Sequence, residues 1–222
     1  SVPSDITTYA LHRKVSDDAA GEMTDTTLVV ASFRGGISGG TIDSMRVIAE
    51  EARNAQSRRL MLNPQALSGG PGEVPRVSLS DEPSDLSIIN AKKVDPSLRG
   101  TLAPFFMAAH NTRIVRRSNA LLDNAYGKDF HYAETMSVGG VPAVSTLIAG
   151  AVAVGTGAFM GAMSFGPTRR VLDRVLPKPG DGPSEKAREN GYFVVDTFTR
   201  TTTGRRYKAR MRAQGDPGYK AT

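Results

Sequence analysis

An uncharged run at residues 141–165, VPAVSTLIAGAVAVGTGAFMGAMSF, constrains this chain more than any other feature. As a helix rising 1.5 Å per residue it would be about 37 Å long, enough to cross the apolar core of a bilayer. It consists mainly of Ala, Gly and Val, so its free energy of membrane insertion is marginal. Gly157 and Gly161 form a GxxxG pattern, which permits close helix approach. We expect burial against protein or shallow membrane contact rather than a full span.

The positive charge of the chain follows this run. Residues 1–165 hold 15 Lys and Arg against 16 Asp and Glu, whereas residues 166–222 hold 13 against 6. This asymmetry favours an anionic partner, which could be lipid headgroups, an acidic carrier protein or a nucleotide phosphate. Nucleic acid is not an expected partner, because aromatic residues make up only 6% of the chain and no nucleic-acid-binding motif appears. If the run did span a bilayer, its basic C-terminal side would face the cytoplasm.

The residue types present exclude several kinds of site. The chain contains no cysteine, which removes disulfides, thiolate nucleophiles, zinc–thiolate sites and iron–sulfur ligation. Its three histidines, His12, His110 and His131, are far apart in sequence, so no metal site is expected. The N-terminus shows neither an initiator Met nor a signal pattern, as if the chain were cut from something longer. We expect a cytoplasmic location, with peripheral attachment to the inner face of the cell membrane as an open alternative.

Local patterns predict an α+β fold with a largely antiparallel or mixed sheet, packed helices and one apolar Ala/Gly-rich helical segment. Helices are expected from Pro3–Ser4–Asp5 onward, from Thr41 to about Gln56, over 111–127 with Asn111 as the N-cap, and over 169–176. Strands are expected at 27–34, 130–137, 191–200 and 205–214, the last two as a hairpin. Residues 66–100 show no sustained periodicity, which is typical of a lid, a binding loop or a disordered insert.

The glycine-rich stretch GGISGGT at residues 35–41 joins a predicted strand to a predicted helix. This order invites a dinucleotide-binding interpretation. However, the spacing is GGxxGG rather than GxGxxG, and no second parallel strand is predicted after the helix. A tight turn that allows close backbone approach is the better interpretation.

No catalytic constellation can be recognised from the residues alone. The chain has no GxSxG motif, no P-loop and no pair of carboxylates at a telling spacing. Tyr132, Tyr207, His131 and Lys220 could each donate a proton, but side chains of these types are more often structural. On these grounds alone, the prediction would stop at a basic α+β domain with an apolar segment.

Several stretches carry a family resemblance across all 222 residues. These are the opening SVPSD, SGGT at 38–41, NTRIVRRSNAL at 111–121, LPKPGDGPS at 176–184 and QGDPGYKAT at 214–222. The chain resembles the saccharopine dehydrogenase-like oxidoreductases, most closely the bacterial trans-acting enoyl reductases. The resemblance implies that residues 1–222 form the substrate-side domain of a longer oxidoreductase, without its N-terminal Rossmann domain. NADP would be bound by that missing domain, so this chain alone is expected to bind no cofactor and to be inactive.

The resemblance also implies a substrate and a set of site residues. Family members reduce a double bond in a polyketide-derived lipid acyl chain, carried by a synthase that lacks its own reductase domain. Ser4 and Asp5 are expected near the seam with the nucleotide domain. Gly39, Gly40 and Thr41 are expected to line the cleft from the other side, and Asn111 and Arg113 to hold a polar substrate group. The resemblance assigns no catalytic residue.

Two further hypotheses remain open at this stage. The chain could be a non-catalytic, membrane-associated lipid-binding or scaffold protein of the same fold. It could also serve amino-acid metabolism of the saccharopine type, as the wider family name implies. The apolar run could line a lipid-tail site or pack at a homodimer interface.

Overall fold

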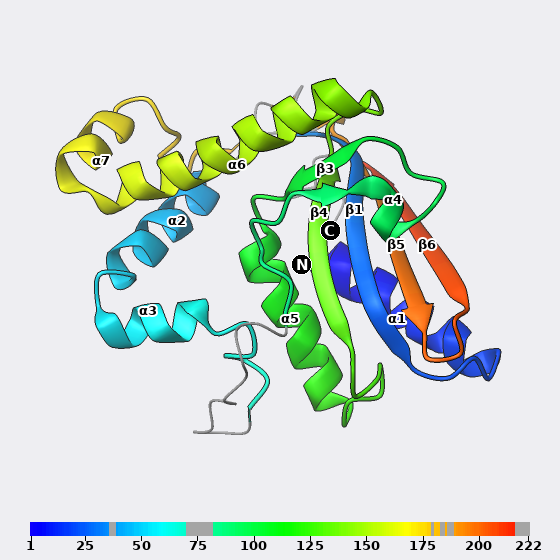
Figure 1. Ribbon diagram of the computed structural model, residues 1–222. Helices are drawn as coiled ribbons and strands as arrows, with labels where there is room; N and C mark the ends of the chain where they lie inside the picture. The colour runs from blue at the N-terminus through cyan, green and yellow to red at the C-terminus, as the bar shows by residue number, and fades with distance from the viewer. Residues whose placement is uncertain (36–38, 70–81, 179, 183–184, 186–188, 216–222) are drawn as a thin grey trace. The chain divides into compact units, whose positions relative to one another are not determined.

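A computed structural model describes residues 1–35, 39–69, 82–178, 180–182, 185 and 189–215 (Figure 1). The described residues form seven helices and a six-stranded mixed sheet, which confirms the predicted α+β class. The chain divides into two compact units. Unit 1 comprises residues 1–32, 63–153 and 194–212, and unit 2 comprises residues 33–62, 154–193 and 213–222.

The sheet lies mostly in unit 1 and has the strand order β2-β3-β4-β1-β5-β6. Its strands are β1 (Met23–Arg34), β2 (Ile89–Asn90), β3 (Thr101–Pro104), β4 (His131–Ser137), β5 (Tyr192–Thr201) and β6 (Arg206–Gln214). β2 pairs antiparallel with β3, and β3 pairs antiparallel with β4. β1 and β4 instead run parallel, with Asp25 opposite His131 and Val30 opposite Met136. The sheet is therefore mixed, and the parallel partner of β1 is a strand far along the chain.

Two helices of unit 1, α1 (Val2–Asp17) and α5 (Ala108–Leu121), pack on one face of this sheet. The hydroxyl groups of Thr7 on α1 and Thr197 on β5 are 2.8 Å apart and hydrogen-bonded, which fixes α1 against the sheet. On the opposite face, Val29 and Phe198 form a core cluster with Ala91 of the short helix α4 (Ala91–Val94). The central strands are thus covered on both faces, as their apolar content requires.

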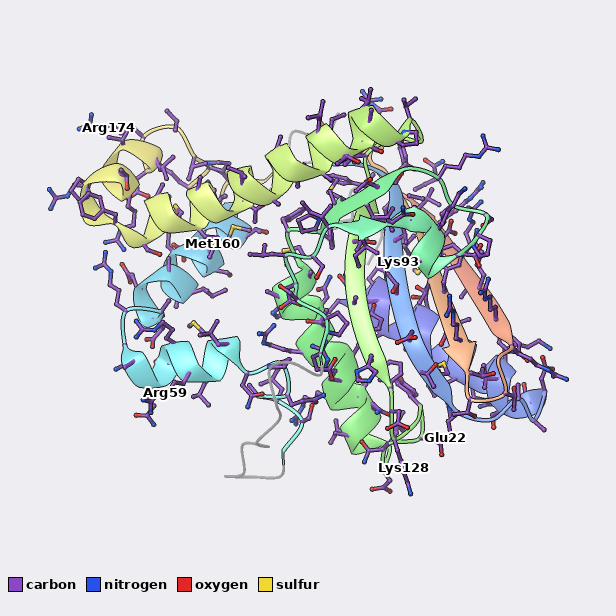
Figure 2. The ribbon with its side chains drawn as sticks, viewed as in Figure 1. Glu22, Arg59, Lys93, Lys128, Met160 and Arg174 are labelled. Atoms are coloured by element: carbon purple, nitrogen blue, oxygen red, sulfur yellow. The ribbon has the colours of Figure 1, made fainter. Side chains whose placement is uncertain are left out.

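Hydrogen bonds of backbone and side-chain groups join the loops at one end of the sheet. The carboxylate of Glu22 accepts a 3.1 Å hydrogen bond from the backbone N–H of Lys128; both residues are labelled in Figure 2. The backbone N–H of Thr202 donates to the carbonyl of Glu22 at 2.9 Å. These bonds join the loop before β1 to the loop before β4 and to the β5–β6 turn.

Unit 2 contains α2 (Gly39–Glu51), α3 (Ala55–Leu62), α7 (Gly166–Leu172) and the C-terminal part of α6 (Pro142–Ser164). Its core cluster is formed by Ile42, Ala49 and Met163. Arg46 on α2 forms an ion pair with Asp173 at 2.8 Å, and Arg169 on α7 forms one with Glu50. The apolar run forms the helix α6, as predicted.

The structure confirms most predicted elements and corrects some boundaries. Strands at 27–34, 130–137, 191–200 and 205–214 are present, with ends that differ by a few residues. The predicted helix to about Gln56 is divided into α2 and α3 by a turn at residues 52–54. The segment 66–100 contains β2 and α4, which were not predicted, while residues 70–81 lie outside the described residues.

Asn111 is not a helix N-cap. The helix begins at Ala108, and Met107 occupies the N-cap position. Asn111 lies within the helix and is buried, and its side chain binds a strand residue instead of the backbone of its own helix. Because Asn is both a common N-cap and a common buried hydrogen-bonding residue, its identity alone could not separate the two roles.

Candidate functional site

The first turns of α1 and α5 meet β4 around a buried carboxylate, Glu134. Glu134 is 3% exposed, Ser4 of α1 is 3% exposed and Asn111 of α5 is 4% exposed. The side-chain amide of Asn111 donates to Glu134 Oε2 at 2.8 Å, and the hydroxyl of Tyr132 donates to Glu134 Oε1 at 3.0 Å. Ser4 also hydrogen-bonds this carboxylate. We call Ser4, Asn111, Tyr132 and Glu134 the Glu134 cluster.

The electrostatics of the Glu134 cluster are set by its burial. Desolvation raises the pKa of the Glu134 carboxyl group above its usual value, although the hydrogen bonds from Ser4, Asn111 and Tyr132 act in the opposite direction. Burial and the neighbouring carboxylate also raise the pKa of Tyr132 well above its usual value. The Tyr132 hydroxyl therefore remains protonated and acts as a hydrogen-bond donor to Glu134.

Titratable groups at the rim of the cluster are less enclosed. His110, which precedes Asn111 on α5, has its pKa lowered by burial and by the nearby positive charge of Arg113. The cluster thus joins a closed interior to a partly exposed polar rim.

Two acceptor oxygens at this junction have no hydrogen-bond donor among the described residues. They are Oδ1 of Asn111 and Oδ1 of Asp5. The orientation of the Asn111 amide is fixed by its other atom, because only the NH₂ group can donate to the Glu134 carboxylate. A buried acceptor without a donor is costly, so its presence indicates a position where a donor from another group is expected.

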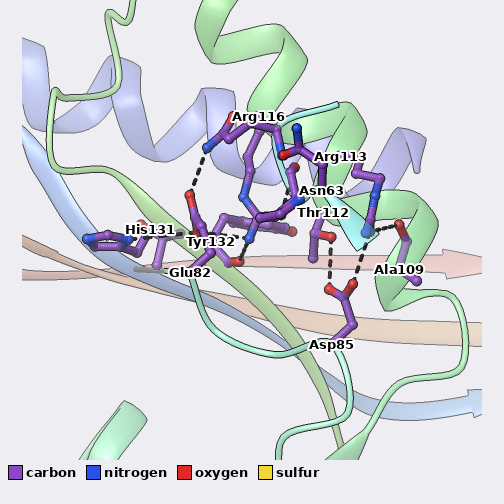
Figure 3. A network of polar contacts seen from close by, with 12 residues as sticks. Asn63, Glu82, Asp85, Ala109, Thr112, Arg113, Arg116, His131 and Tyr132 are labelled. Carbon is purple, nitrogen blue, oxygen red and sulfur yellow. Dashed lines mark hydrogen bonds and ion pairs between the residues drawn. The ribbon is translucent and has the colours of Figure 1, made fainter. Parts of the chain in front are cut away.

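A second polar network lies further along α5 and is shown in Figure 3. Arg116 is 2% exposed; its guanidinium group donates to Glu82 Oε2 at 3.0 Å and to the carbonyl of Tyr132 at 2.7 Å. His131 Nδ1 is 3.7 Å from the same Glu82 oxygen. Because Tyr132 belongs to both networks, α5 is fixed to β4 by polar contacts on two successive turns.

Arg113 and Thr112 of α5 share one acceptor, the carboxylate of Asp85. The Arg113 guanidinium group forms an ion pair with Asp85 at 3.0 Å, and it also donates to the backbone carbonyl of Ala109. Arg113 is therefore engaged in holding the segment before β2 against α5. A substrate would have to compete with these contacts to bind Arg113.

The structure brings together four of the seven residues predicted for the site. Ser4, Asp5, Asn111 and Arg113 all belong to unit 1 and lie at the α1–α5 junction or on the next turn of α5. The three others, Gly39, Gly40 and Thr41, begin α2 in unit 2. Of the motifs that carried the resemblance, Ser38, residues 179 and 183–184, and residues 216–222, which include Lys220, lie outside the described residues.

Sequence reasoning missed Glu134, around which these residues gather. In HYAETMS, Glu134 stands between Ala133 and Thr135, and a strand with one exposed face would place its charged side chain in solvent. A signal was present, because Tyr132 and Glu134 share a face through the period of two. Only the position of β4 inside the sheet shows that both are buried.

Other sites are limited among the described residues. No group of three or more His, Asp or Glu side chains that could hold a metal ion occurs there. An open pocket of about 170 Å³ lies on the sheet face opposite the Glu134 cluster. It is lined by Asp25, Thr27, Ile89, Lys93, Val94, Phe198 and Arg200.

The chain matches no family model and no solved structure. It is, however, 50% identical over its whole length to a Mycobacterium tuberculosis protein provisionally named a trans-acting enoyl reductase, of which it covers 53%. It is 40% identical to a trans-acting enoyl reductase of Mycobacterium ulcerans, with 94% of this chain and 50% of the relative covered. It is 39% identical to one of Mycobacterium bovis, with 100% and 53% covered.

These relatives confirm the resemblance to the trans-acting enoyl reductases. The chain spans about half the length of the curated relatives it matches. Their names do not bear on the wider saccharopine dehydrogenase-like family, which remains a prediction.

Proposed function

We propose that this chain, a homologue of the trans-acting enoyl reductases over its whole length, forms the substrate-side part of such an enzyme. The observation that carries the proposal is the 50% identity across the entire chain to a protein of that name. The buried Glu134 cluster supports it, because polar groups concentrated at one helix junction are typical of a site.

The reaction would be reduction of a carbon–carbon double bond in an acyl chain of a polyketide-derived lipid. A hydride adds to the β-carbon and a proton to the α-carbon, while a nicotinamide cofactor is oxidised. We propose NADPH as the hydride donor, bound by a part of the enzyme outside this chain. The acyl chain would be presented on the carrier of a separate synthase, as the words "trans-acting" in the names of the relatives suggest.

In this proposal the Glu134 cluster positions rather than reacts. Asn111, Tyr132 and Glu134 are too enclosed to touch a substrate directly. Their hydrogen bonds hold the first turns of α1 and α5 at fixed positions on β4. Oδ1 of Asp5, which has no donor among the described residues, is then available to a donor group of the ligand or of the rest of the enzyme.

An assay of cofactor oxidation tests the function. The whole enzyme should oxidise NADPH in the presence of an α,β-unsaturated acyl thioester, and the 222-residue chain alone should not. Arg117→Ala in the whole enzyme, a change at an exposed position of α5, is a control substitution and should leave the rate of NADPH oxidation unchanged. Activity on saccharopine without activity on the acyl thioester would contradict the acyl substrate and favour the amino-acid alternative.

A second candidate function is a non-catalytic, membrane-associated lipid-binding or scaffold protein. The exposure of α6 favours it, because only 11% of its apolar window is buried. The same assay separates the two candidates. A whole enzyme that binds acyl thioester but never oxidises NADPH or NADH would support the scaffold and contradict the reductase.

A further inference from the structure

α6 is a surface helix whose outward face is apolar and uncharged. Leu147 is 77% exposed, Val154 is 73% exposed and Val144 is 53% exposed. Among the described residues, α6 is long and apolar enough to cross a membrane, with a mean hydropathy of 1.7. We propose that this face binds the surface of an anionic lipid membrane, with α6 lying in the plane of the interface rather than crossing the bilayer.

The opposite face of α6 is buried against other residues of the protein, which argues against a membrane-spanning helix. In unit 1, Ser145 and Ala149 are fully buried, and the Ser145 hydroxyl accepts a 2.9 Å hydrogen bond from the backbone N–H of Thr101. In unit 2, Met163 is fully buried in the core cluster with Ile42. A helix crossing a bilayer alone would have to expose these groups to lipid, so only the outward face is available.

The outward face forms a continuous stripe at helical spacing. Its exposed residues are Val144, Leu147, Ile148, Ala151, Val154, Gly155, Ala158, Gly161 and, just beyond the helix, Phe165. An added Cβ at Gly155, Gly157 or Gly161 would meet no atom within 4 Å, so nothing in the described chain packs there. Exposed apolar surface of this extent marks an interaction site.

The charges next to the stripe identify the occupant. Within unit 2, the exposed cations Arg170, Arg174 and Lys178 follow α6, and Arg174 is labelled in Figure 2. Between them lie Val171 and Val175, which are 60% and 76% exposed. An anionic lipid surface offers both an apolar interior for the stripe and phosphate groups for the cations. A second copy of α6 would cover the apolar stripe but would supply no anion to these side chains.

Vesicle flotation of the 222-residue chain tests the proposal. The chain should float with vesicles of phosphatidylcholine and phosphatidylglycerol, and less with phosphatidylcholine alone. Leu147→Glu should weaken partitioning about tenfold, because it removes one large apolar side chain from the interface. Leu121→Glu is the matched control, since Leu121 is 68% exposed on α5, and it should float as the unchanged chain does.

A charge variant separates the two contributions. Arg170→Glu combined with Arg174→Glu should abolish the preference for anionic vesicles while leaving the stripe intact. Circular dichroism should be used to check that each variant is folded. We expect all of them to fold, because the substituted positions are exposed. Absence of flotation with anionic vesicles would overturn the proposal. So would a dimer by light scattering that Leu147→Glu dissociates without any effect on flotation, because a second copy would then cover the stripe.

Discussion

The side-chain amide of Asn111 donates a 2.8 Å hydrogen bond to the carboxylate of Glu134, and both residues are more than nine-tenths buried. The bond connects the first turns of α5 to the centre of β4. It also places a residue that looks like a helix cap at the centre of the candidate site. A buried carboxylate with few donors depends strongly on each of them, so this contact can be tested by substitution.

Two substitutions of Asn111 should differ in their pH dependence. Asn111→Ala removes one donor and should lower the free energy of unfolding by about 1–3 kcal/mol. Asn111→Asp instead places a second carboxylate beside Glu134, so one of the two must stay protonated. Urea unfolding should show the Asp variant losing stability relative to the Ala variant as pH rises. Parallel pH profiles of the two variants would show that Asn111 does not face a carboxylate.

Glu134 itself should make the protein less stable as pH rises. Because its folded pKa is raised above the usual 4.5, the folded state holds the proton more tightly than the unfolded state. Its contribution to stability is therefore present below the unfolded pKa and is lost as pH rises through the folded pKa. Gln does not titrate, so this loss should be absent from Glu134→Gln. As pH rises, the free energy of unfolding of the unchanged chain should therefore fall relative to that of the variant. A gap that is constant with pH would contradict the raised pKa.

Asp196 should show the opposite dependence. Burial acts to raise its pKa, but hydrogen bonds from Arg210 and Lys208 outweigh burial and lower the pKa. Arg210 holds both carboxylate oxygens, at 2.5 and 2.6 Å. The contribution of Asp196 is thus present above its unfolded pKa and is lost as pH falls through the folded pKa. Asp196→Asn should flatten the acid side of the stability profile, whereas Arg212→Ala, on the same face of β6, should not.

The sequence was sufficient where local pattern and burial agree. The strand predicted at 205–214 alternates apolar and basic side chains, and the structure shows Tyr207 and Met211 half-buried and Lys208 and Arg212 exposed. The uncharged run predicted a single long helix, and α6 is that helix. In each case the side chains that share a face by periodicity are also similar in burial, so the local sequence pattern is enough to predict the element.

The sequence was insufficient where distant segments decide. β2 and β3 have two and four residues, and they exist because β3 pairs with β4, with Leu102 opposite Ser137. The burial of Glu134 likewise depends on β1 and α5 covering β4, which no local period reports. The start of α5 was misplaced for the same reason. The hydrogen-bond partner of Asn111, Glu134, lies 23 residues further along the chain on β4, so the local sequence does not reveal it.

Arg116 should be the most costly residue of α5 to change. It is 2% exposed, and its guanidinium group serves Glu82 and the carbonyl of Tyr132 at once. Arg116→Met leaves the buried Glu82 carboxylate without this cation, and removal of one partner of a buried ion pair costs about 3–5 kcal/mol. Arg117→Ala on the same helix is the control and should stay within about 0.5 kcal/mol. Equal losses for the two variants in urea unfolding would contradict the buried network.

Gly100 should tolerate no side chain, for two separable reasons. Its φ of +79° is a conformation that residues with a Cβ rarely adopt. In addition, a Cβ there would lie 2.6 Å from the carbonyl oxygen of Gly139 and 2.7 Å from the hydroxyl of Ser145. Gly204, with φ of +81°, has no atom within 4 Å of such a Cβ, so Gly204→Ala carries the conformational cost of about 1 kcal/mol alone. Gly100→Ala should therefore lower the unfolding free energy clearly more than Gly204→Ala, and equal effects would mean that the loop before β3 moves away from Gly139 and Ser145 without cost.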